Sequence, residues 1–137
     1  MTPVLLDTGA IVALIDRSEK HHDATVKVLK NLERPLVTCE GVIAEACYLL
    51  RQFRGGADAI LENVDRGIFQ IPFLLNRSAA QVSRILRKRG NRTDFADACL
   101  IELADQLGTG DILTLDPDFE FYRWRRNRPF NLLLPRG

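Results

Sequence analysis

The chain has 137 residues, a formal net charge of +1, and a composition that is 46% hydrophobic and 27% charged. This length fits one globular domain, 1–137, with a substantial core, and the near-neutral charge by itself indicates no particular partner. The longest apolar runs are far too short to span a membrane, and no basic region precedes an apolar run at the N-terminus, which excludes a signal peptide.

Apolar runs and amphipathic stretches alternate along the chain. In chain order they predict a strand at 3–7, a helix at 9–16, a loop and helix across 17–33, a strand at 35–38, helices at 40–53 and 57–67, a strand at 68–72, helices at 78–90 and 93–107, a strand at 111–116, a helical turn at 117–124 and a strand at 130–135. Thr38 and Ser78 are expected to cap the helices that follow them. This alternation predicts an α/β fold with a mostly parallel central sheet.

The three cysteines, Cys39, Cys47 and Cys99, are odd in number and show no CxxC spacing. All three lie in apolar stretches, which predicts reduced, buried thiols. This is typical of a cytoplasmic protein.

Four carboxylates fall where such a fold would bring them together. Asp7 and Asp116 end predicted strands, and ligands of open α/β sheets bind outside the carboxyl ends of the strands. Glu45 is expected to be half-buried on the helix at 40–53. Asp97 lies in the first turn of its helix and borders the apolar face, whereas Glu102 is expected to face water.

Three of these acids also have local structural explanations. Asp7 can accept N–H groups of the following turn, and Asp116 before a proline matches a helix N-cap. Asp94 and Asp97 together resemble a capping box, and we expect Asp94 to be the N-cap. Glu45 has no such explanation. One shared cause, a common ligand for all four carboxylates, is more economical than separate explanations.

A hard divalent cation is the ligand that four clustered carboxylates indicate. Unit charges about 4 Å apart repel by roughly 4 kcal/mol at an effective dielectric constant of 20, so the cluster would not stay ionised without compensation. Mg²⁺ and Mn²⁺ prefer such oxygen ligands, whereas Zn²⁺ would require His or Cys. The only histidines, His21 and His22, are adjacent in a polar loop. Cations in acidic pockets commonly polarise phosphates and activate a water for attack.

Two basic stretches suit a polyanion as partner. From residue 66 to residue 93 the chain has no acid, and the basic residues near the end of that stretch are candidates for binding an RNA backbone: Arg84, Arg87, Lys88, Arg89 and Arg92. A second group of arginines surrounds Trp124: Arg123, Arg125, Arg126 and Arg128. Solvated helix faces are an equally good explanation of either stretch alone.

Taken in order, DTGAIVALID, the Glu in CEGVIAEACYLL, TDFADACLIELADQLG and ILTLDPDF resemble the PIN-domain family, and most closely its VapC-type ribonuclease toxins. The resemblance covers essentially the whole chain. It implies a three-layer α/β/α sandwich and a Mg²⁺- or Mn²⁺-dependent endoribonuclease that a small antitoxin silences, with frequent homodimerisation. It implies metal ligands at Asp7, Glu45, Asp97 and Asp116, and supporting roles for Thr8, Asp94 and Thr114. Asp118 is a lesser candidate than Asp116.

Other families and roles fit less well or are left open. A haloacid-dehalogenase-like phosphatase needs an acid where Gly9 stands, a receiver domain needs an early acidic pair, and a dinucleotide-binding domain needs a glycine-rich loop. A PIN nuclease of housekeeping RNA processing would carry the same acids. A PIN-like scaffold that binds RNA or protein without cutting it would have lost one or more of them.

Overall fold

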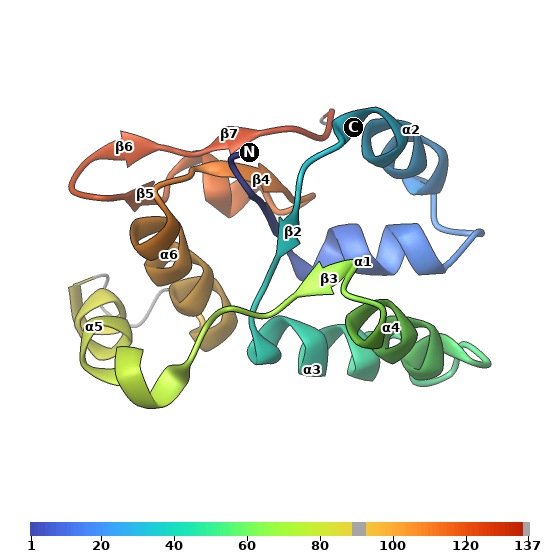
Figure 1. Ribbon diagram of the computed structural model, residues 1–137, viewed down its shortest axis with the longest axis horizontal. Helices are drawn as coiled ribbons and strands as arrows, with labels where there is room; N and C mark the ends of the chain where they lie inside the picture. The colour runs from blue at the N-terminus through green and yellow to red at the C-terminus, as the bar shows by residue number, and fades with distance from the viewer. Residues whose placement is uncertain (89–92, 136–137) are drawn as a thin grey trace.

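A computed structural model of the protein describes residues 1–88 and 93–135. Five parallel strands form its central sheet in the order β3-β2-β1-β4-β7 (Figure 1). Their bounds are β1 (Val4–Leu6), β2 (Leu36–Val37), β3 (Phe69–Gln70), β4 (Asp111–Leu113) and β7 (Asn131–Leu132). The short strands β5 (Arg123–Trp124) and β6 (Arg128–Pro129) pair with each other as a separate antiparallel hairpin.

Six α-helices and one 3-10 turn surround the sheet. They are α1 (Thr8–Ile15), α2 (His22–Leu32), α3 (Glu40–Leu49), α4 (Gly56–Asp65), α5 (Leu75–Lys88), α6 (Phe95–Leu107) and the 3-10 turn η1 (Pro117–Glu120). Helices α5 and α6 lie on one side of the sheet, and α1, α2 and α4 lie on the other (Figure 1). Helix α3 contacts both α1 and α6. The predicted α/β/α fold with a parallel sheet is confirmed.

The core explains why the central strands are so apolar. All three residues of β1 are fully buried, because strands lie on both sides of β1 and helices cover both faces of the sheet. Near β7, Phe119 of η1 packs edge-on against Tyr122 and Phe130, with ring centroids 4.9 and 5.3 Å apart. This aromatic cluster anchors the segment after β4 to the sheet.

The order of the strands defines where a ligand site is expected. From β1 the chain passes to β2 and β3 on one side, and later to β4 and β7 on the other. The switch point therefore lies between β1 and β4, at their carboxyl ends, where open α/β sheets bind ligands.

Two predicted caps are wrong. Helix α5 begins at Leu75, so Ser78 lies inside it, where its buried hydroxyl accepts a hydrogen bond of 2.8 Å from Gln106 of α6. The N-cap of α3 is Cys39, and the hydroxyl of Thr38 instead donates to the carbonyl of Leu6 at 2.7 Å. In both cases a contact with a neighbouring element outweighs the local capping preference.

Glu102 does not face water as predicted. It is only 8% exposed, because α5 covers that side of α6, and it accepts a hydrogen bond of 3.0 Å from Gln106. Burial raises the pKa of its carboxyl.

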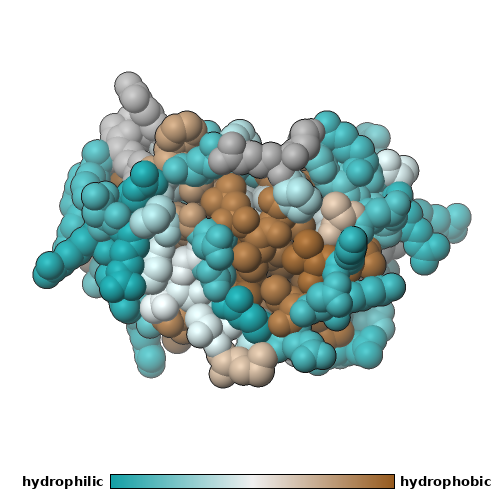
Figure 2. Space-filling view, turned by 90° about the horizontal axis from the view of Figure 1, so that it is seen from above, coloured by the Kyte–Doolittle hydropathy of each residue, from teal (hydrophilic) through white to brown (hydrophobic). Residues whose placement is uncertain are grey.

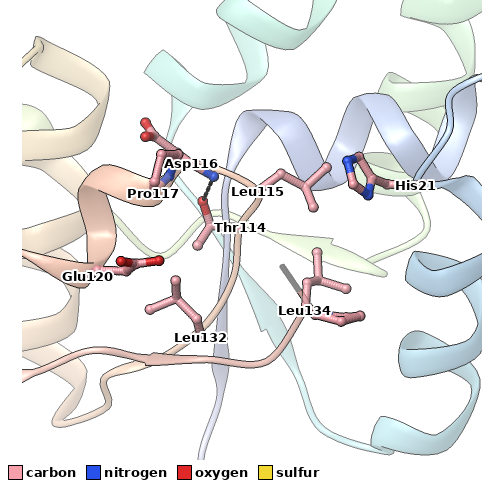
Figure 3. Close-up of a pocket in the computed structure, with 9 residues that line it drawn as sticks. His21, Thr114, Leu115, Asp116, Pro117, Glu120, Leu132 and Leu134 are labelled. Carbon is pink, nitrogen blue, oxygen red and sulfur yellow. Dashed lines mark hydrogen bonds between the residues drawn. The ribbon is translucent and has the colours of Figure 1, made fainter. Parts of the chain in front are cut away.

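Seen from above, the molecule has an apolar area at its centre that hydrophilic side chains frame (Figure 2). Leu132 and Leu134 line a cavity of about 240 Å³ together with Leu115 and His21 (Figure 3). The Asp116 side chain points away from this cavity (Figure 3). In the described part of the chain, no helix has both the length and the apolar character that crossing a membrane requires.

Candidate metal centre

Asp7 lies directly after β1 and caps α1. Its carboxylate accepts the backbone N–H of Thr8 at 2.8 Å and the hydroxyl of Thr114 at 2.6 Å, and the residue is only 5% exposed. The predicted helix start at Gly9 is one residue late, because Asp7 is the cap. The structural role expected of Asp7 is therefore present, and it holds the carboxylate at the switch point.

Asp116 reaches the same place from β4. The strand ends at Leu113, three residues before Asp116. The prediction that Asp116 itself ends the strand is therefore wrong. It caps η1 by accepting the N–H of Asp118 at 2.9 Å. Its own N–H donates to the Thr114 hydroxyl at 3.0 Å, and that hydroxyl donates to Asp7. Thr114 thus joins two of the acids.

Asp97 comes from the other side of the site, in the first turn of α6. Asp94 caps that helix as expected, because its carboxylate accepts the N–H of Asp97 at 2.8 Å. Only the backbone N–H of Asp97 takes part in this cap, so its carboxylate is left for other contacts. It accepts the hydroxyl of Tyr122 at 3.0 Å and is 6% exposed.

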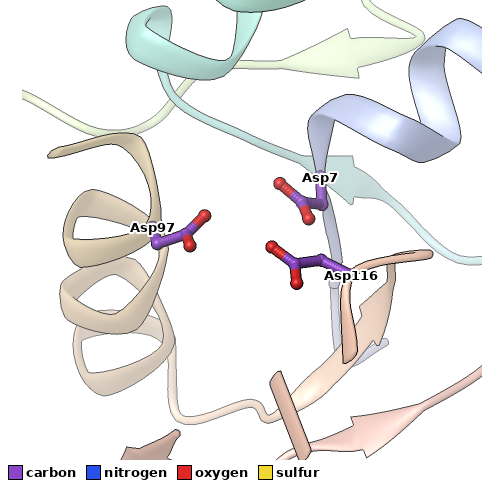
Figure 4. Close-up of side chains that lie close together, drawn as sticks. All are labelled: Asp7, Asp97 and Asp116. Carbon is purple, nitrogen blue, oxygen red and sulfur yellow. The ribbon is translucent and has the colours of Figure 1, made fainter. Parts of the chain in front are cut away.

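These three carboxylates face one another (Figure 4). One oxygen atom of each of Asp7, Asp97 and Asp116 lies within 4.8 Å of the others. Burial raises the pKa of Asp7 to about 6, against the hydrogen bond from Thr114. Burial, with the neighbouring charge of Asp7, raises the pKa of Asp97 to about 8. The pKa of Asp116 is raised as well, chiefly by burial. The cluster therefore resists full ionisation at neutral pH.

The chemistry of this cavity fits a divalent cation. It has a volume of about 260 Å³ and is lined by Asp7, Thr8, Gly9, Glu45, Leu49, Asp94, Asp97, Leu115 and Asp116. Carboxylate oxygens are the donors that Mg²⁺ and Mn²⁺ prefer. The buried hydroxyl of Thr8 has no hydrogen-bond partner among the described residues, and such groups are rare unless a ligand or water satisfies them. Bound positive charge would favour the ionised carboxylates and so lower the pKa values that burial, together with repulsion among the acids, raises.

Glu45 differs from its prediction. It lines the same cavity from α3, and its charge adds a small contribution to the pKa increase that burial chiefly causes at Asp7 and Asp116. However, it is exposed and does not belong to the close group of three. The expectation of a half-buried side chain is wrong, because α3 turns this face toward solvent at the cavity rim.

The family can be identified from these features together with the whole chain. The family model described as PIN domain matches residues 4–124. The chain belongs to the PIN-domain family. It is 32% identical over 117 residues to Ribonuclease VapC26 of Mycobacterium tuberculosis (strain ATCC 25618 / H37Rv), covering 82% of this chain and 86% of that protein. The crystal structure of Mycobacterium tuberculosis VapC20, a Sarcin-Ricin loop cleaving toxin, matches with a TM-score of 0.77 at 18% identity. That match covers 92% of this chain and 99% of the other, and it supports the PIN fold.

Three of the basic residues predicted to bind RNA lie on α5, namely Arg84, Arg87 and Lys88. None of them lines the acidic cavity. Arg84 and Arg87 are exposed, and Arg87 donates to Ser83 of the same helix at 3.1 Å. Lys88, the last residue of α5, lines a different cavity. Arg89 and Arg92 lie outside the described residues.

Tyr122 is the site residue that sequence reasoning missed. It lies 25 residues from Asp97 and beyond the 3-10 turn, where no periodic pattern marks it. The hydrogen bond lowers the pKa of Asp97, and burial and the charge of Asp97 raise the pKa of the Tyr122 hydroxyl. Tyr122 is therefore a candidate positioning residue, one that orients the carboxylate and favours its charged form.

Replacing Tyr122 by Phe is expected to lower activity by about tenfold, because one charge-assisted hydrogen bond to Asp97 is lost. Without this donor the pKa of Asp97 rises further, so the acidic limb of the pH–rate profile should move to higher pH. RNA cleavage measured across pH, together with thermal unfolding, tests this. A lower rate with an unshifted profile would mean that Tyr122 acts only on packing.

Proposed function

We propose that the chain, as one PIN domain over residues 1–137, is a Mg²⁺- or Mn²⁺-dependent endoribonuclease and the toxin of a type II, VapBC-type toxin–antitoxin pair. The observation that carries the proposal is the group of three carboxylates, two buried and one partly buried, whose oxygen atoms lie within 4.8 Å of one another at the switch point of the sheet. The similarity to a protein named as a VapC ribonuclease supports the choice of RNA as substrate.

Each residue has a role that its contacts support. Asp7, Asp97 and Asp116 would hold the cation, and Glu45 at the rim would add charge or bind through water. A cation bound there supplies the Lewis acidity that activates a water and stabilises charge on the phosphate. Thr114 fixes Asp7 relative to Asp116 through its hydroxyl, at 2.6 Å from Asp7 and 3.0 Å from the Asp116 N–H. The Thr8 hydroxyl, which has no hydrogen-bond partner among the described residues, would be available to a water or to the substrate.

The antitoxin is proposed to cover an apolar surface on α3 and the segment after it. Tyr48, Leu49, Phe53 and Leu61 are 62%, 54%, 39% and 52% exposed. Leu49 also lines the acidic cavity. A partner that packs on this surface can therefore place a basic side chain among the carboxylates and silence them. We further propose that the protein acts in the cytoplasm and that it forms a homodimer. Light scattering of the purified protein tests the homodimer.

Expression in a heterologous host tests toxicity and chemistry together. The wild-type protein is expected to arrest growth, and the Asp7→Asn variant is expected to be harmless at equal abundance. The purified wild type should cleave RNA with Mg²⁺ and stop in excess EDTA. Full activity of the variant, or of the wild type in EDTA, would refute the mechanism. Cleavage in vitro without growth arrest would favour the housekeeping alternative.

A further inference from the structure

A groove with an excess of positive charge lies outside the acidic site, between α5, α6 and the β5–β6 hairpin. It has a volume of about 360 Å³ and is lined by Ile85, Lys88, Ile101, Asp105, Arg123, Arg125, Arg126 and Asn127. Four basic side chains thus face one carboxylate. Because the formal net charge of the whole chain is only +1, this concentration of positive charge is local.

Ion pairs between the described residues do not neutralise this charge. Among the residues that the structure describes, the pairs within 4 Å are Arg34–Asp111 and Arg66–Glu62, and neither touches the groove. Arg125 donates instead to the backbone carbonyl of Asp105 at 2.7 Å. Similarly, Arg123 donates to the carbonyls of Glu120 and Tyr122 at 3.1 and 2.9 Å. Such bonds fix the direction of a guanidinium and leave its charge for an external anion.

The turn of the β5–β6 hairpin contains two consecutive residues with an unfavourable backbone conformation. Arg125 and Arg126 have φ values of 38° and 70°, in the left-handed region that is unfavourable for residues other than glycine. Tight hairpins usually place Asn or Gly there. Two guanidiniums lie over the Trp124 ring, with the central carbon of Arg125 at 5.7 Å and that of Arg128 at 5.4 Å from the ring centroid. Two consecutive arginines at strained positions indicate that the hairpin is shaped to present them.

One face of α6 connects this groove to the acids. Asp97, Ile101 and Asp105 are spaced at i, i+4 and i+8, so they lie along the same side of the helix. The segment after η1 follows that side, because Tyr122 contacts Asp97 and Arg125 contacts Asp105. Eight residues of helix span about 12 Å. At about 3.4 Å per stacked nucleotide, this distance corresponds to three or four nucleotides.

We propose that this groove binds the phosphate backbone of single-stranded RNA a few nucleotides from the bond that is cut. The inference rests on the proposed ribonuclease function and adds the β5–β6 hairpin to the substrate path. Lys88 and Arg126 would contact phosphates directly, and Arg123 and Arg125 would contribute oriented charge. Binding here anchors long RNA without contacting the metal centre.

Binding to RNA without cleavage gives the first test. Affinity of the full chain for a fluorescent single-stranded RNA of about 12 nucleotides is measured in EDTA over a range of salt concentrations. The Lys88→Gln/Arg126→Gln variant is expected to bind about tenfold more weakly at low salt. The plot of log K against log salt should also become shallower by about 1.4, because each of two lost phosphate contacts accounts for about 0.7 of its slope. The matched control is Arg17→Gln/Arg54→Gln, which removes the same charge at exposed positions outside the groove.

Substrate length gives the second test. In Mg²⁺, the groove variant should raise KM for the RNA of about 12 nucleotides several-fold. It should change KM much less for an RNA of about 2 nucleotides, which at about 3.4 Å per nucleotide is too short to reach both sites. An unchanged salt slope, an equal loss in the control, or an equal effect on both lengths overturns the proposal. If no RNA is cleaved at all, the ribonuclease function fails, and the binding result still decides whether the groove holds RNA.

Discussion

The Asp97→Asn substitution is expected to lower the rate of RNA cleavage by about 10³-fold or more, and to raise the melting temperature of the metal-free protein. The pKa of about 8 shows that ionised Asp97 is costly in this buried position without a cation. Asn keeps the shape and can still accept the Tyr122 hydroxyl, but it supplies no charge for a cation. Loss of activity and gain of stability should therefore appear together.

Glu102→Gln is the matched control for this substitution. Glu102 lies on the same helix, is 8% exposed and also has a raised pKa, but it does not line the acidic cavity. Its hydrogen bond from Gln106 can be kept by the amide oxygen. Cleavage of a fluorescent RNA by this variant should stay within about twofold of the wild type. Equal losses in both variants would mean that neutralising any buried acid of α6 disturbs the fold, and the metal centre would lose its support.

The sequence alone located Asp7 and Asp97 because the patterns that single them out hold in the folded protein. It also placed Asp116 in the site, although the strand that Asp116 was expected to end stops at Leu113. Asp7 comes immediately after a fully apolar run, and parallel strands bring the ends of such runs to one edge. Asp97 sits among apolar residues of a helix, where an acid without a partner is costly. Strand order was not predictable in the same way. The pairing of β1 with β4 depends on contacts between segments about 100 residues apart, and no local pattern encodes it.

The errors share a physical cause, which is packing between elements. Glu102 looked solvent-facing on its own helix, but α5 covers it. Glu45 looked half-buried from its apolar neighbours, but Ala44, Glu45, Tyr48 and Leu49 form an exposed side of α3. Tyr122 gave no signal, because its role depends on a contact made across 25 residues. Periodicity within an element describes its own two faces, and it does not say which face a distant helix will cover.

Stability of the metal-free protein is expected to fall as the pH rises from about 4 to about 8, opposite to the usual behaviour of paired carboxylates. Folding raises the pKa of Asp7 to about 6 and of Asp97 to about 8, both above the ordinary value near 3.9. Between these limits the folded protein keeps protons that the unfolded chain releases, so the free energy of unfolding decreases with pH. At about 1.4 kcal/mol per pH unit for each proton, the total effect is on the order of several kcal/mol.

Mg²⁺ should reverse this trend, because it binds the ionised cluster and competes with protons. Its effect on the melting temperature is therefore expected to be small near about pH 5 and large near about pH 8, measured by calorimetry with and without EDTA. The Asp7→Asn/Asp97→Asn variant should show a flatter pH dependence and little response to Mg²⁺. The Glu102→Gln variant, by contrast, keeps both acids and should keep the wild-type response to Mg²⁺. If the double variant keeps the wild-type pH dependence, the protons are held elsewhere. If it keeps the Mg²⁺ response, the cation binds outside this cluster, and these carboxylates are not its ligands.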